Sequence, residues 1–311
     1  MADRGHPREA WARAVWEAAE AAGGGESLEW TRRKKGGPLL RNWLYSMLAL
    51  MLLGTPWRAF AASWETGAKV GFDSNVNLSM DQEESEGWVS AYLSFFREPS
   101  GESRVDWTLA SSLEGTAYLN LSDLYNAAIT ISPGLSFVPS HPWSLQVAPF
   151  FEAKAVRDSE QSALSFGGKV SLGQRLGRNW YSGQYYLYQD SRAEVDTYSF
   201  TEHAVGIYLG ASWTSALFTE LGYEFSHGDS FLTLTSSEVT VQGKGRHRHY
   251  SQTFSGYVVR DTVDRHQIGV TVGIDWTRSV FSQAGYTFTL VDGDLGSMDV
   301  HETFAGVGWR F

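Results

Sequence analysis

From Ala62 to the end of the chain, apolar and polar positions alternate with a period of two. In the last segment one parity holds Thr303, Ala305, Val307, Trp309 and Phe311, and the other holds Phe304, Gly306, Gly308 and Arg310. Side chains of a strand point alternately to its two faces, so this pattern predicts half-buried β-strands.

Two architectures fit such alternation. A soluble sandwich would bury the apolar parity against a second sheet. A membrane barrel would turn it toward lipid and line its lumen with the polar parity. Three features favour the barrel: a predicted export signal, segments of about ten residues, and aromatic residues at segment ends, where membrane girdles lie. These are Trp64, Phe72, Trp88, Trp143, Trp180, Trp213, Trp276 and Trp309.

The predicted fold is therefore all-β, a closed antiparallel transmembrane β-barrel formed by residues 62–311. It has about fourteen strands, near 62–72, 88–96, 104–115, 126–137, 143–155, 164–173, 180–190, 203–213, 217–227, 232–242, 249–259, 266–277, 281–290 and 300–311. The weak segment 232–242 is included because such barrels have even strand numbers; twelve strands is the alternative. Pro133 has no backbone N–H for the ladder and predicts a bulge or a different boundary.

The connections fall into two kinds. Short turns are predicted at 97–103, 139–142, 174–179, 214–216, 243–248 and 278–280. Longer loops are predicted at 73–87, 119–125, 156–163, 191–202, 228–231, 260–265 and 291–299. Short turns of outer-membrane barrels face the periplasm and longer loops face outward.

Residues 1–61 carry a targeting pattern. A basic cluster from Arg32 to Arg41 precedes the apolar stretch 43–53, and the pattern Ala59-Phe60-Ala61 follows. This order predicts a cleavable signal peptide that ends at Ala61, with Ala59 and Ala61 as the cleavage positions. The alternative, a membrane anchor, is disfavoured because the apolar stretch is too short. Residues 1–30 indicate no function.

Composition narrows the function classes. The 311 residues include no cysteine and carry a formal net charge of −10. A disulfide scaffold and a cysteine-ligated metal are thereby excluded, and the acidic balance argues against nucleic acid as a partner. After residue 61 no apolar run approaches the ~18 residues of a spanning helix, so a membrane would have to be crossed by strands.

Charged residues on the polar parity are predicted to face the lumen, because a cation on the lipid face costs about 2–4 kcal/mol. The mixed lining indicates either a hydrated pore with weak cation preference or ion pairs that brace the wall. Inward glycines, namely Gly167, Gly206, Gly210, Gly269, Gly273, Gly306 and Gly308, are expected to relieve crowding where the wall curves. The predicted lumen charges are Glu65, Lys69, Arg104, Asp106, Glu114, Glu152, Lys154, Lys169, Glu220, Glu224, Asp275 and Arg310.

Two segments hold candidate chemistry. Ser226–Ser230 contains His227, Asp229 and Ser230, but nucleophilic catalysis needs such groups to converge in space, and this segment is expected at a loop tip. The tract 243–249 places His247 and His249 on one strand face, where two ligands alone do not make a metal site. The sequence therefore predicts no enzyme activity, no catalytic or cofactor-binding residue, no cofactor and no metal.

Two short motifs suggest a family. Gly71-Phe72-Asp73-Ser74-Asn75-Val76-Asn77 resembles a stretch near the start of the barrel domain in surface lipoprotein assembly modifiers. The ending 306–311 resembles the closing strand of many outer-membrane barrels, that family included. The resemblance implies that Val307, Trp309 and Phe311 are read by the barrel-insertion machinery. That family places a periplasmic helical-repeat domain before its barrel, whereas here the predicted signal leads directly into the first strand.

The sequence thus predicts a bacterial outer-membrane protein for transport or export across that membrane, with surface lipoprotein assembly as one form. A passive porin-like channel for small hydrophilic solutes is the alternative, and a lipid-modifying enzyme is the third hypothesis. Expected partners are outer-membrane lipid, the barrel-assembly machinery, and either a surface lipoprotein or a separate helical-repeat protein.

Overall fold

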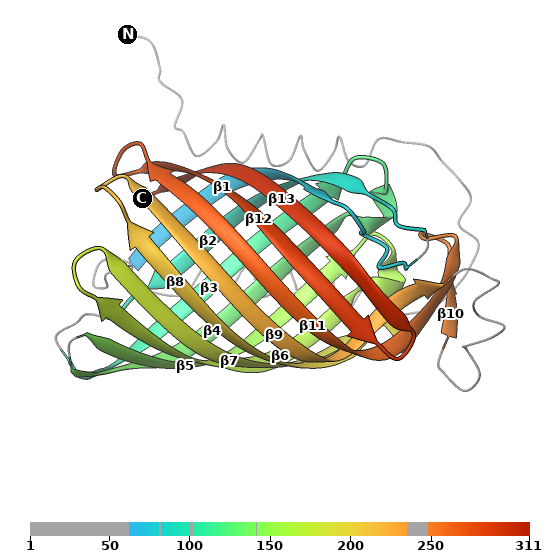
Figure 1. The fold of residues 1–311 in the computed structure, drawn as a ribbon, viewed down its shortest axis with the longest axis horizontal. Coiled ribbons are helices and arrows are strands. Elements are labelled where there is room, and N and C mark those ends of the chain that lie inside the picture. The colour runs from blue at the N-terminus through green and yellow to red at the C-terminus, as the bar shows by residue number, and fades with distance from the viewer. Residues whose placement is uncertain (1–61, 81, 100–102, 141, 235–247) are drawn as a thin grey trace, which may run out of the picture. The chain divides into compact units, whose positions relative to one another are not determined.

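Twelve strands close into an antiparallel barrel (Figure 1). The computed structural model describes residues 62–80, 82–99, 103–140, 142–234 and 248–311. The wall strands are β1 (Ala62–Asp73), β2 (Glu86–Arg97), β3 (Val105–Tyr118), β4 (Asn126–Ser140), β5 (Trp143–Val156), β6 (Ala163–Leu176), β7 (Trp180–Ala193), β8 (Phe200–Ser212), β9 (Leu217–Leu234), β11 (Gly256–Asp275), β12 (Val280–Gly293) and β13 (Gly296–Arg310). A short strand, β10 (Arg248–Ser251), pairs with the start of β11.

Closure joins the first strand to the last. β1 pairs with β13 from Glu65↔Arg310 to Asp73↔Glu302. Next to these pairs, Trp64 of β1 and Phe311, which follows β13, exchange two backbone hydrogen bonds of 2.9 and 3.0 Å. No edge is left open along this seam, as a barrel in lipid requires.

The predicted count of fourteen strands is wrong, and the alternative count of twelve is confirmed. β9 and β11 are far longer than a spanning strand needs, and they remain paired from Leu217↔Ile274 to Leu234↔Tyr257. The predicted loops 228–231 and 260–265 lie inside these strands, and the predicted loop 291–299 is mostly β12 and β13. The alternation of a long hairpin continues past the membrane, so the pattern alone suggested additional strands. Of the predicted turn 243–248, only Arg248 is among the described residues.

The two ends of the barrel differ. One end, here the turn end, holds Ala62, Phe311 and the short connections, such as Leu176 to Trp180 and Asp275 to Val280. The other, the loop end, holds the remaining connections, including the 3-10 helices η1 (Ser122–Leu124), η2 (Ser159–Gln161) and η3 (Asp196–Tyr198). In outer-membrane barrels the turn end faces the periplasm.

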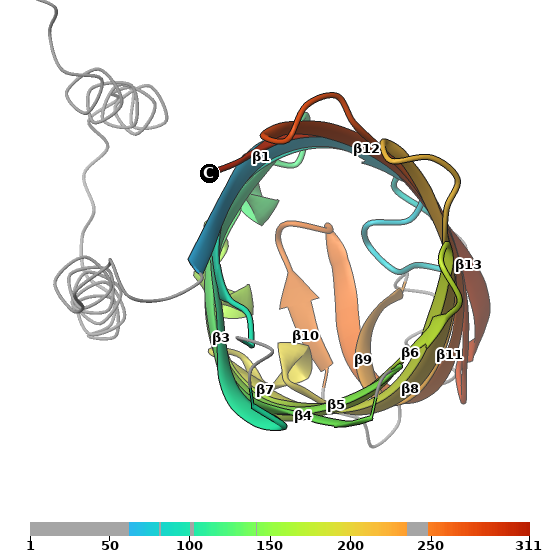
Figure 2. The same ribbon diagram turned by 90° about the vertical axis from the view of Figure 1, so that its left-hand side faces the viewer.

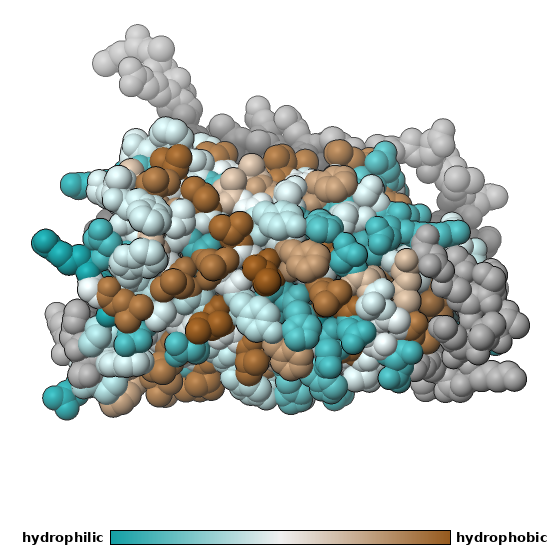
Figure 3. All heavy atoms as spheres, viewed as in Figure 1, coloured by the Kyte–Doolittle hydropathy of each residue, from teal (hydrophilic) through white to brown (hydrophobic). Residues whose placement is uncertain are grey.

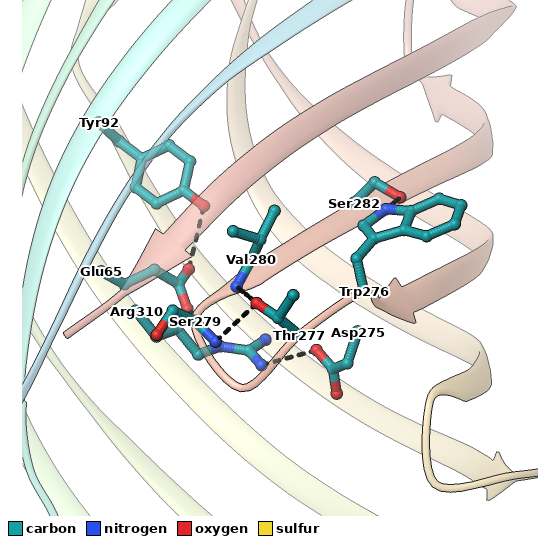
Figure 4. Close-up of polar contacts among 9 residues, drawn as sticks. All are labelled: Glu65, Tyr92, Asp275, Trp276, Thr277, Ser279, Val280, Ser282 and Arg310. Atoms are coloured by element: carbon teal, nitrogen blue, oxygen red, sulfur yellow. Dashed lines mark hydrogen bonds and ion pairs between the residues drawn. The ribbon is translucent and has the colours of Figure 1, made fainter.

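Two turns at the turn end share one sequence pattern and one geometry. The sequence 213–219 (WTSALFT) and the sequence 276–282 (WTRSVFS) match in Trp, Thr, Phe and the final hydroxyl. The hydroxyl oxygen of Thr277 accepts from the backbone N–H groups of Ser279 and Val280 at 3.2 and 2.9 Å, and Thr214 does the same in its turn. Trp276 Nε1 donates to Ser282 Oγ at 2.9 Å (Figure 4). Threonine thus closes the turn where a glycine would otherwise be expected.

The prediction of a bulge or a different boundary at Pro133 is wrong. β4 continues through Pro133, and its register with β5 is the same at Ile131↔Phe151 and Leu135↔Val147. In that register Pro133 faces Pro149, and two residues without N–H groups interrupt the ladder together. The register shift lies farther along, between Phe137 and Ser140.

The outer face is apolar between two aromatic zones, and Figure 3 shows apolar residues distributed over one side of it. Exposed side chains include Val70, Leu135, Leu221 and Ile268. Tryptophans gather at the turn end, among them Trp180, Trp213, Trp276 and Trp309. Toward the loop end, tyrosine hydroxyls bond histidines in the pairs Tyr186–His203, Tyr223–His266 and Tyr286–His301, at 2.7 to 2.8 Å. Such amphipathic rings belong at a membrane–water boundary.

Trp88 is an exception among the predicted girdle residues. Its ring lies over Gly71 of the neighbouring strand, on the inner face of the wall. No helix among the described residues is long and apolar enough to cross a membrane.

Candidate functional site: the lumen and its cap

The strand register places most of the predicted lumen charges on one face of the sheet, opposite the apolar belt. Directly opposed residues of an antiparallel pair share a face, and the pairings connect one strand to the next around the barrel. Arg104 differs, because it precedes β3 and lies exposed in the turn before it. The residues on the inner face are Glu65, Lys69, Asp106, Glu114, Glu152, Lys154, Lys169, Glu220, Glu224, Asp275 and Arg310.

Several of these charges brace the wall. Arg310 donates from Nε to Glu65 Oε2 at 3.2 Å and from an Nη to Asp275 Oδ1 at 2.8 Å. Tyr92 Oη donates to Glu65 Oε1 at 3.0 Å, so the chain of contacts crosses the β1–β13 seam (Figure 4). Asp106 forms an ion pair of 3.4 Å with Arg97, which has the outer parity and whose guanidinium lies over the Trp107 ring. Glu65, Asp275 and Arg310 are thus engaged with one another at the turn end of the lumen.

Aromatic rings lie against the inner wall over glycines. A Cβ atom on Gly206 would overlap the ring of Tyr185, one on Gly210 the ring of Tyr181, and one on Gly183 the ring of Tyr208. The same arrangement recurs around the barrel, in the pairs Tyr92/Gly67, Phe150/Gly167, Phe218/Gly273, Phe281/Gly308 and Phe304/Gly285. Each ring therefore fills the volume that its cross-strand glycine leaves empty, and it does not extend into the centre of the lumen.

Two hollows open from the inner wall. One, of about 430 Å³, is lined by Thr130, Ser132, Gln146, Ala148, Phe150, Lys169, Ser171, Tyr185, Leu187 and Tyr208. The other, of about 400 Å³, lies nearer the turn end and is lined by Val138, Pro142, Trp143, Ser144, Gly173, Gln174, Arg175, Tyr181, Ser182 and Tyr208. Tyr208 lines both, so they meet along β7 and β8. Six of the ten residues that line the first carry a hydroxyl or an amide group.

At the loop end a small sheet, here called the cap, lies in the mouth of the barrel (Figure 2). It consists of the ends of β9 (228–234) and β11 (256–263), of β10, and of residues 77–79 of the first loop. Thr233 joins that loop to β9, donating from its N–H to Leu78 O at 3.1 Å and from its hydroxyl to Asn77 O at 2.6 Å.

Both faces of the cap are buried. On one face Leu232, Leu234, Val259 and Val263 pack against Val291, Leu295 and Met298, with Leu78 and Met80 beside them. On the other, Val258 and Phe254 pack against Leu124 and Tyr198. Leu232, Val258 and Val259 are completely inaccessible to solvent. The most thoroughly buried apolar side chains of the described barrel thus lie in its mouth.

The motif that suggested a family folds the first loop. Asn75 is fully buried; its Nδ2 donates to Ser79 O at 2.8 Å, and its Oδ1 accepts from Ser79 N at 2.9 Å. Asn77 forms the same kind of pair with Gln82 O and Glu84 N, at 2.8 and 3.0 Å. The two amides take the place of backbone partners, as asparagine does in tight turns.

The β10 hairpin is tied to the β5–β6 loop. His249 Nε2 lies 2.6 Å from Glu160 Oε2, and Thr253 Oγ1 donates to Asp158 Oδ2 at 2.8 Å. Because β11 and β5 are well separated around the wall, these contacts fasten the cap across the mouth. Burial raises the pKa of Tyr198, which packs below this hairpin, to about 12, so the phenol stays neutral.

The candidate catalytic residues do not converge. His227 lies on the outer face of β9, where its Nδ1 is 2.7 Å from Asp264, whereas Ser230 has the opposite parity and is buried in the cap region. Asp229 pairs with Arg260. His247 lies outside the described residues, and within the described ranges no cluster of three or more metal-ligating side chains occurs.

The cap is the feature that sequence reasoning missed. The available signal was a change of composition on one parity. The inward positions of β9 are Glu220, Glu224 and Ser226 in the lumen but Leu232 and Leu234 beyond it. Apolar residues that replace polar ones on the inward parity indicate that this end of the strand is covered by other elements.

No protein-family model matches the chain, and no curated protein matches it. Among solved structures, an outer membrane channel from Pseudomonas putida F1 is 9% identical, with a TM-score of 0.57 over 83% of this chain and 100% of that one. A KdgM porin in complex with disordered oligogalacturonate is 7% identical, with a TM-score of 0.46 over 79% and 99%. The NanC porin is 9% identical, with a TM-score of 0.46 over 78% and 98%. At these identities the likeness concerns the fold.

The protein is an outer-membrane β-barrel, as its closed wall, its exposed apolar belt and the likeness of its fold to the Pseudomonas putida channel indicate. The specific resemblance to surface lipoprotein assembly modifiers is not shown by these comparisons. Val307, Trp309 and Phe311 lie on the outer face of the closing strand and are exposed; their reading by the insertion machinery stays a prediction. The predicted signal peptide, with Ala59 and Ala61, lies outside the described residues.

Proposed function

We propose that this barrel is a channel for small hydrophilic solutes, and that the cap controls passage at the loop end. The observation that carries the proposal is the construction of the lumen. Its large side chains lie over glycines, and hydroxyls, an amide and a lysine are among the groups that line the space that remains. A wall built only for rigidity would fill its interior with interdigitating side chains, as small barrels do.

The lining suggests weak cation preference. Acidic residues outnumber basic ones among the inner-face charges, and Glu220 and Glu224 lie one above the other on β9. Strong selectivity needs charge concentrated at a constriction, whereas these carboxylates are held by tyrosine hydroxyls. In a KCl gradient we expect the reversal potential to shift toward the value for a cation-selective pore. The shift should stay far short of ideal selectivity.

The second candidate is a partner-gated exporter, and the capped mouth favours it. A surface lipoprotein or a separate helical-repeat protein would then displace the cap. The folded first-loop motif supports the cap itself, because its asparagines bond within the loop.

Planar-bilayer recording tests the channel. The cysteine-free chain permits a clean lock on the cap, Ser79→Cys with Thr233→Cys, at two positions that pair across a bridge and thus lie within disulfide reach. We expect steady currents from the native protein and a large reduction when the cysteine pair is oxidised, reversed by reductant. Silence of both proteins, and of a variant with a loosened cap, would overturn the channel. Currents unchanged by oxidation would overturn the control by the cap.

A further inference from the structure

We propose that Tyr181, Tyr208 and Tyr185 form a binding track for the pyranose rings of a neutral oligosaccharide, an inference that rests on the proposed channel function. The three rings line the wall where β7 and β8 meet, and Tyr208 belongs to both lumen hollows. A solute that moves along this wall from one hollow to the other would contact them.

The rings form a ladder along the strand direction. Tyr181 lies over Gly210, Tyr208 over Gly183 and Tyr185 over Gly206. Residues 181, 183 and 185 are two apart on one strand, so successive rings are about 6.8 Å apart along the wall. The ring centroids of Tyr181 and Tyr208 are 6.3 Å apart. The glycines are buried and the tyrosines half-buried, because each ring lies against the backbone of its cross-strand glycine and keeps part of its surface on the lumen side.

Neighbouring carboxylates hold the rings in place. Tyr181 Oη donates to Glu220 Oε2 at 3.1 Å, and Tyr185 Oη donates to Glu224. A carboxylate has about four acceptor sites, and each tyrosine uses one of them. The remaining sites lie beside the rings, where they can accept hydrogen bonds from sugar hydroxyls.

Hydroxyl and amide groups surround Tyr185 and Tyr208. Ser171, Thr130, Ser132 and Gln146 line the hollow that holds Tyr185 and Tyr208. Such groups both donate and accept, which suits the ring of hydroxyls around a pyranose. The apolar C–H face of the sugar would lie on the tyrosine ring, as apolar bodies with polar edges do at aromatic surfaces.

An organic cation is a less suitable occupant. The ammonium of Lys169 already lies over the Tyr185 ring, 4.0 Å from its centroid, and would repel a second cation there. The glutamates that could neutralise a cation are bonded to tyrosine hydroxyls. A neutral sugar would stack on Tyr181 and Tyr208, whereas beside Tyr185 its hydroxyls would accept hydrogen bonds from the Lys169 ammonium.

Calorimetry on the full barrel in detergent tests the track without requiring ion current. The probes are maltohexaose, cellohexaose and isomaltohexaose, with choline and an oligogalacturonate as charged comparisons. We expect at least one neutral hexasaccharide to bind, Tyr208→Leu to weaken its binding about tenfold through loss of the ring face, and Tyr208→Phe to keep it within about threefold. Tyr92→Leu is the matched control, since Tyr92 also lies over a glycine but on the far wall.

The outcomes separate the two proposals. Absence of binding by all three neutral probes at millimolar concentration overturns the track, even when the barrel conducts. Binding of choline alone, or equal weakening by Tyr208→Leu and Tyr92→Leu, also overturns it. Hexasaccharide binding by a barrel that carries no current would leave the track in place and remove the channel. Heat-dependent gel mobility shows that each variant is folded.

Discussion

β9 and β11 run through two environments, and the same inward parity is used differently in each. In the lumen it carries Glu220, Glu224 and Thr271, next to water-accessible space. In the cap, beyond Gly228 of β9 and before Val263 of β11, the inward positions hold Leu232, Leu234 and Val259, which are buried. The strands, their pairing and their register continue without a break. Only the surroundings of the inner face differ: it borders the lumen in one region and packed side chains in the other.

The difference shows which surroundings each region needs. The lumen wall is stabilised in lipid by its ladder and its outer belt, so its inner face is free to remain polar. The cap lies beyond the membrane, where an extended hairpin needs apolar burial on its faces to stay ordered. It obtains this from the first loop, from β12 and β13, and from η1 and η3.

The largest expected effect is a cavity in the cap. Leu232 is completely buried, so Leu232→Ala removes its transfer energy and leaves a void, at a cost of about 2–5 kcal/mol. We expect the backbone amides of 228–234 and 256–263 to exchange hydrogen faster, while exchange in the wall strands stays unchanged. Leu221→Ala on the same strand is the control, because Leu221 is 55% exposed and leaves no void. Equal effects would contradict a separately packed cap.

A smaller effect is expected where an aromatic ring lies over a glycine of the inner wall. A side chain at Gly206 overlaps the Tyr185 ring, so Gly206→Val should destabilise the barrel by about 1–3 kcal/mol in urea unfolding. Gly269→Val is the matched control, since the nearest atom to its Cβ is Thr287 Oγ1 at 3.6 Å. The double variant with Tyr185→Ala should recover most of the loss; failure to recover it would show that the glycine is needed for the backbone alone.

Loosening the hairpin contacts tests whether the cap moves. His249→Ala with Thr253→Ala removes its bonds to Glu160 and Asp158. Each contributes about 0.5–1 kcal/mol, so the open probability in bilayers should rise about fivefold to thirtyfold. His203→Ala, which loses only outer-face contacts with Tyr186 and Tyr188, should leave it unchanged. An unchanged open probability in the double variant would mean that the cap is static.

The smallest effect is expected at the closing seam. The Arg310 side chain is 40% exposed and its partners Glu65 and Asp275 are 24% and 35% exposed, so water screens the pairs. Arg310→Met should cost about 0–1 kcal/mol in urea unfolding, and less at high salt. A loss well above that range would show that the charges, rather than the β1–β13 ladder, hold the barrel closed.

Much of the wall could be predicted from the sequence, while much of the site could not. Alternation identified the strands and the parity of Lys169, Glu220 and Glu224. It did not show that Tyr185 would lie over Gly206, because that pairing depends on the register between strands. The inward glycines were expected to relieve curvature, and several instead accommodate a ring. Asn75 and Asn77 suggested a family but not the hydrogen bonds that fold the loop.

The sequence by itself determined the barrel, because period-two alternation, strand-length segments and aromatic ends are local properties that each segment carries alone. Only the tertiary structure decided the strand number, the ring-on-glycine lining and the cap. Each depends on which distant residues meet: Leu234 becomes buried where the first loop, β12 and β13 surround it, and no local pattern specifies those partners. Burial depends on the surroundings as well as on the residue, and the surroundings come from the whole fold.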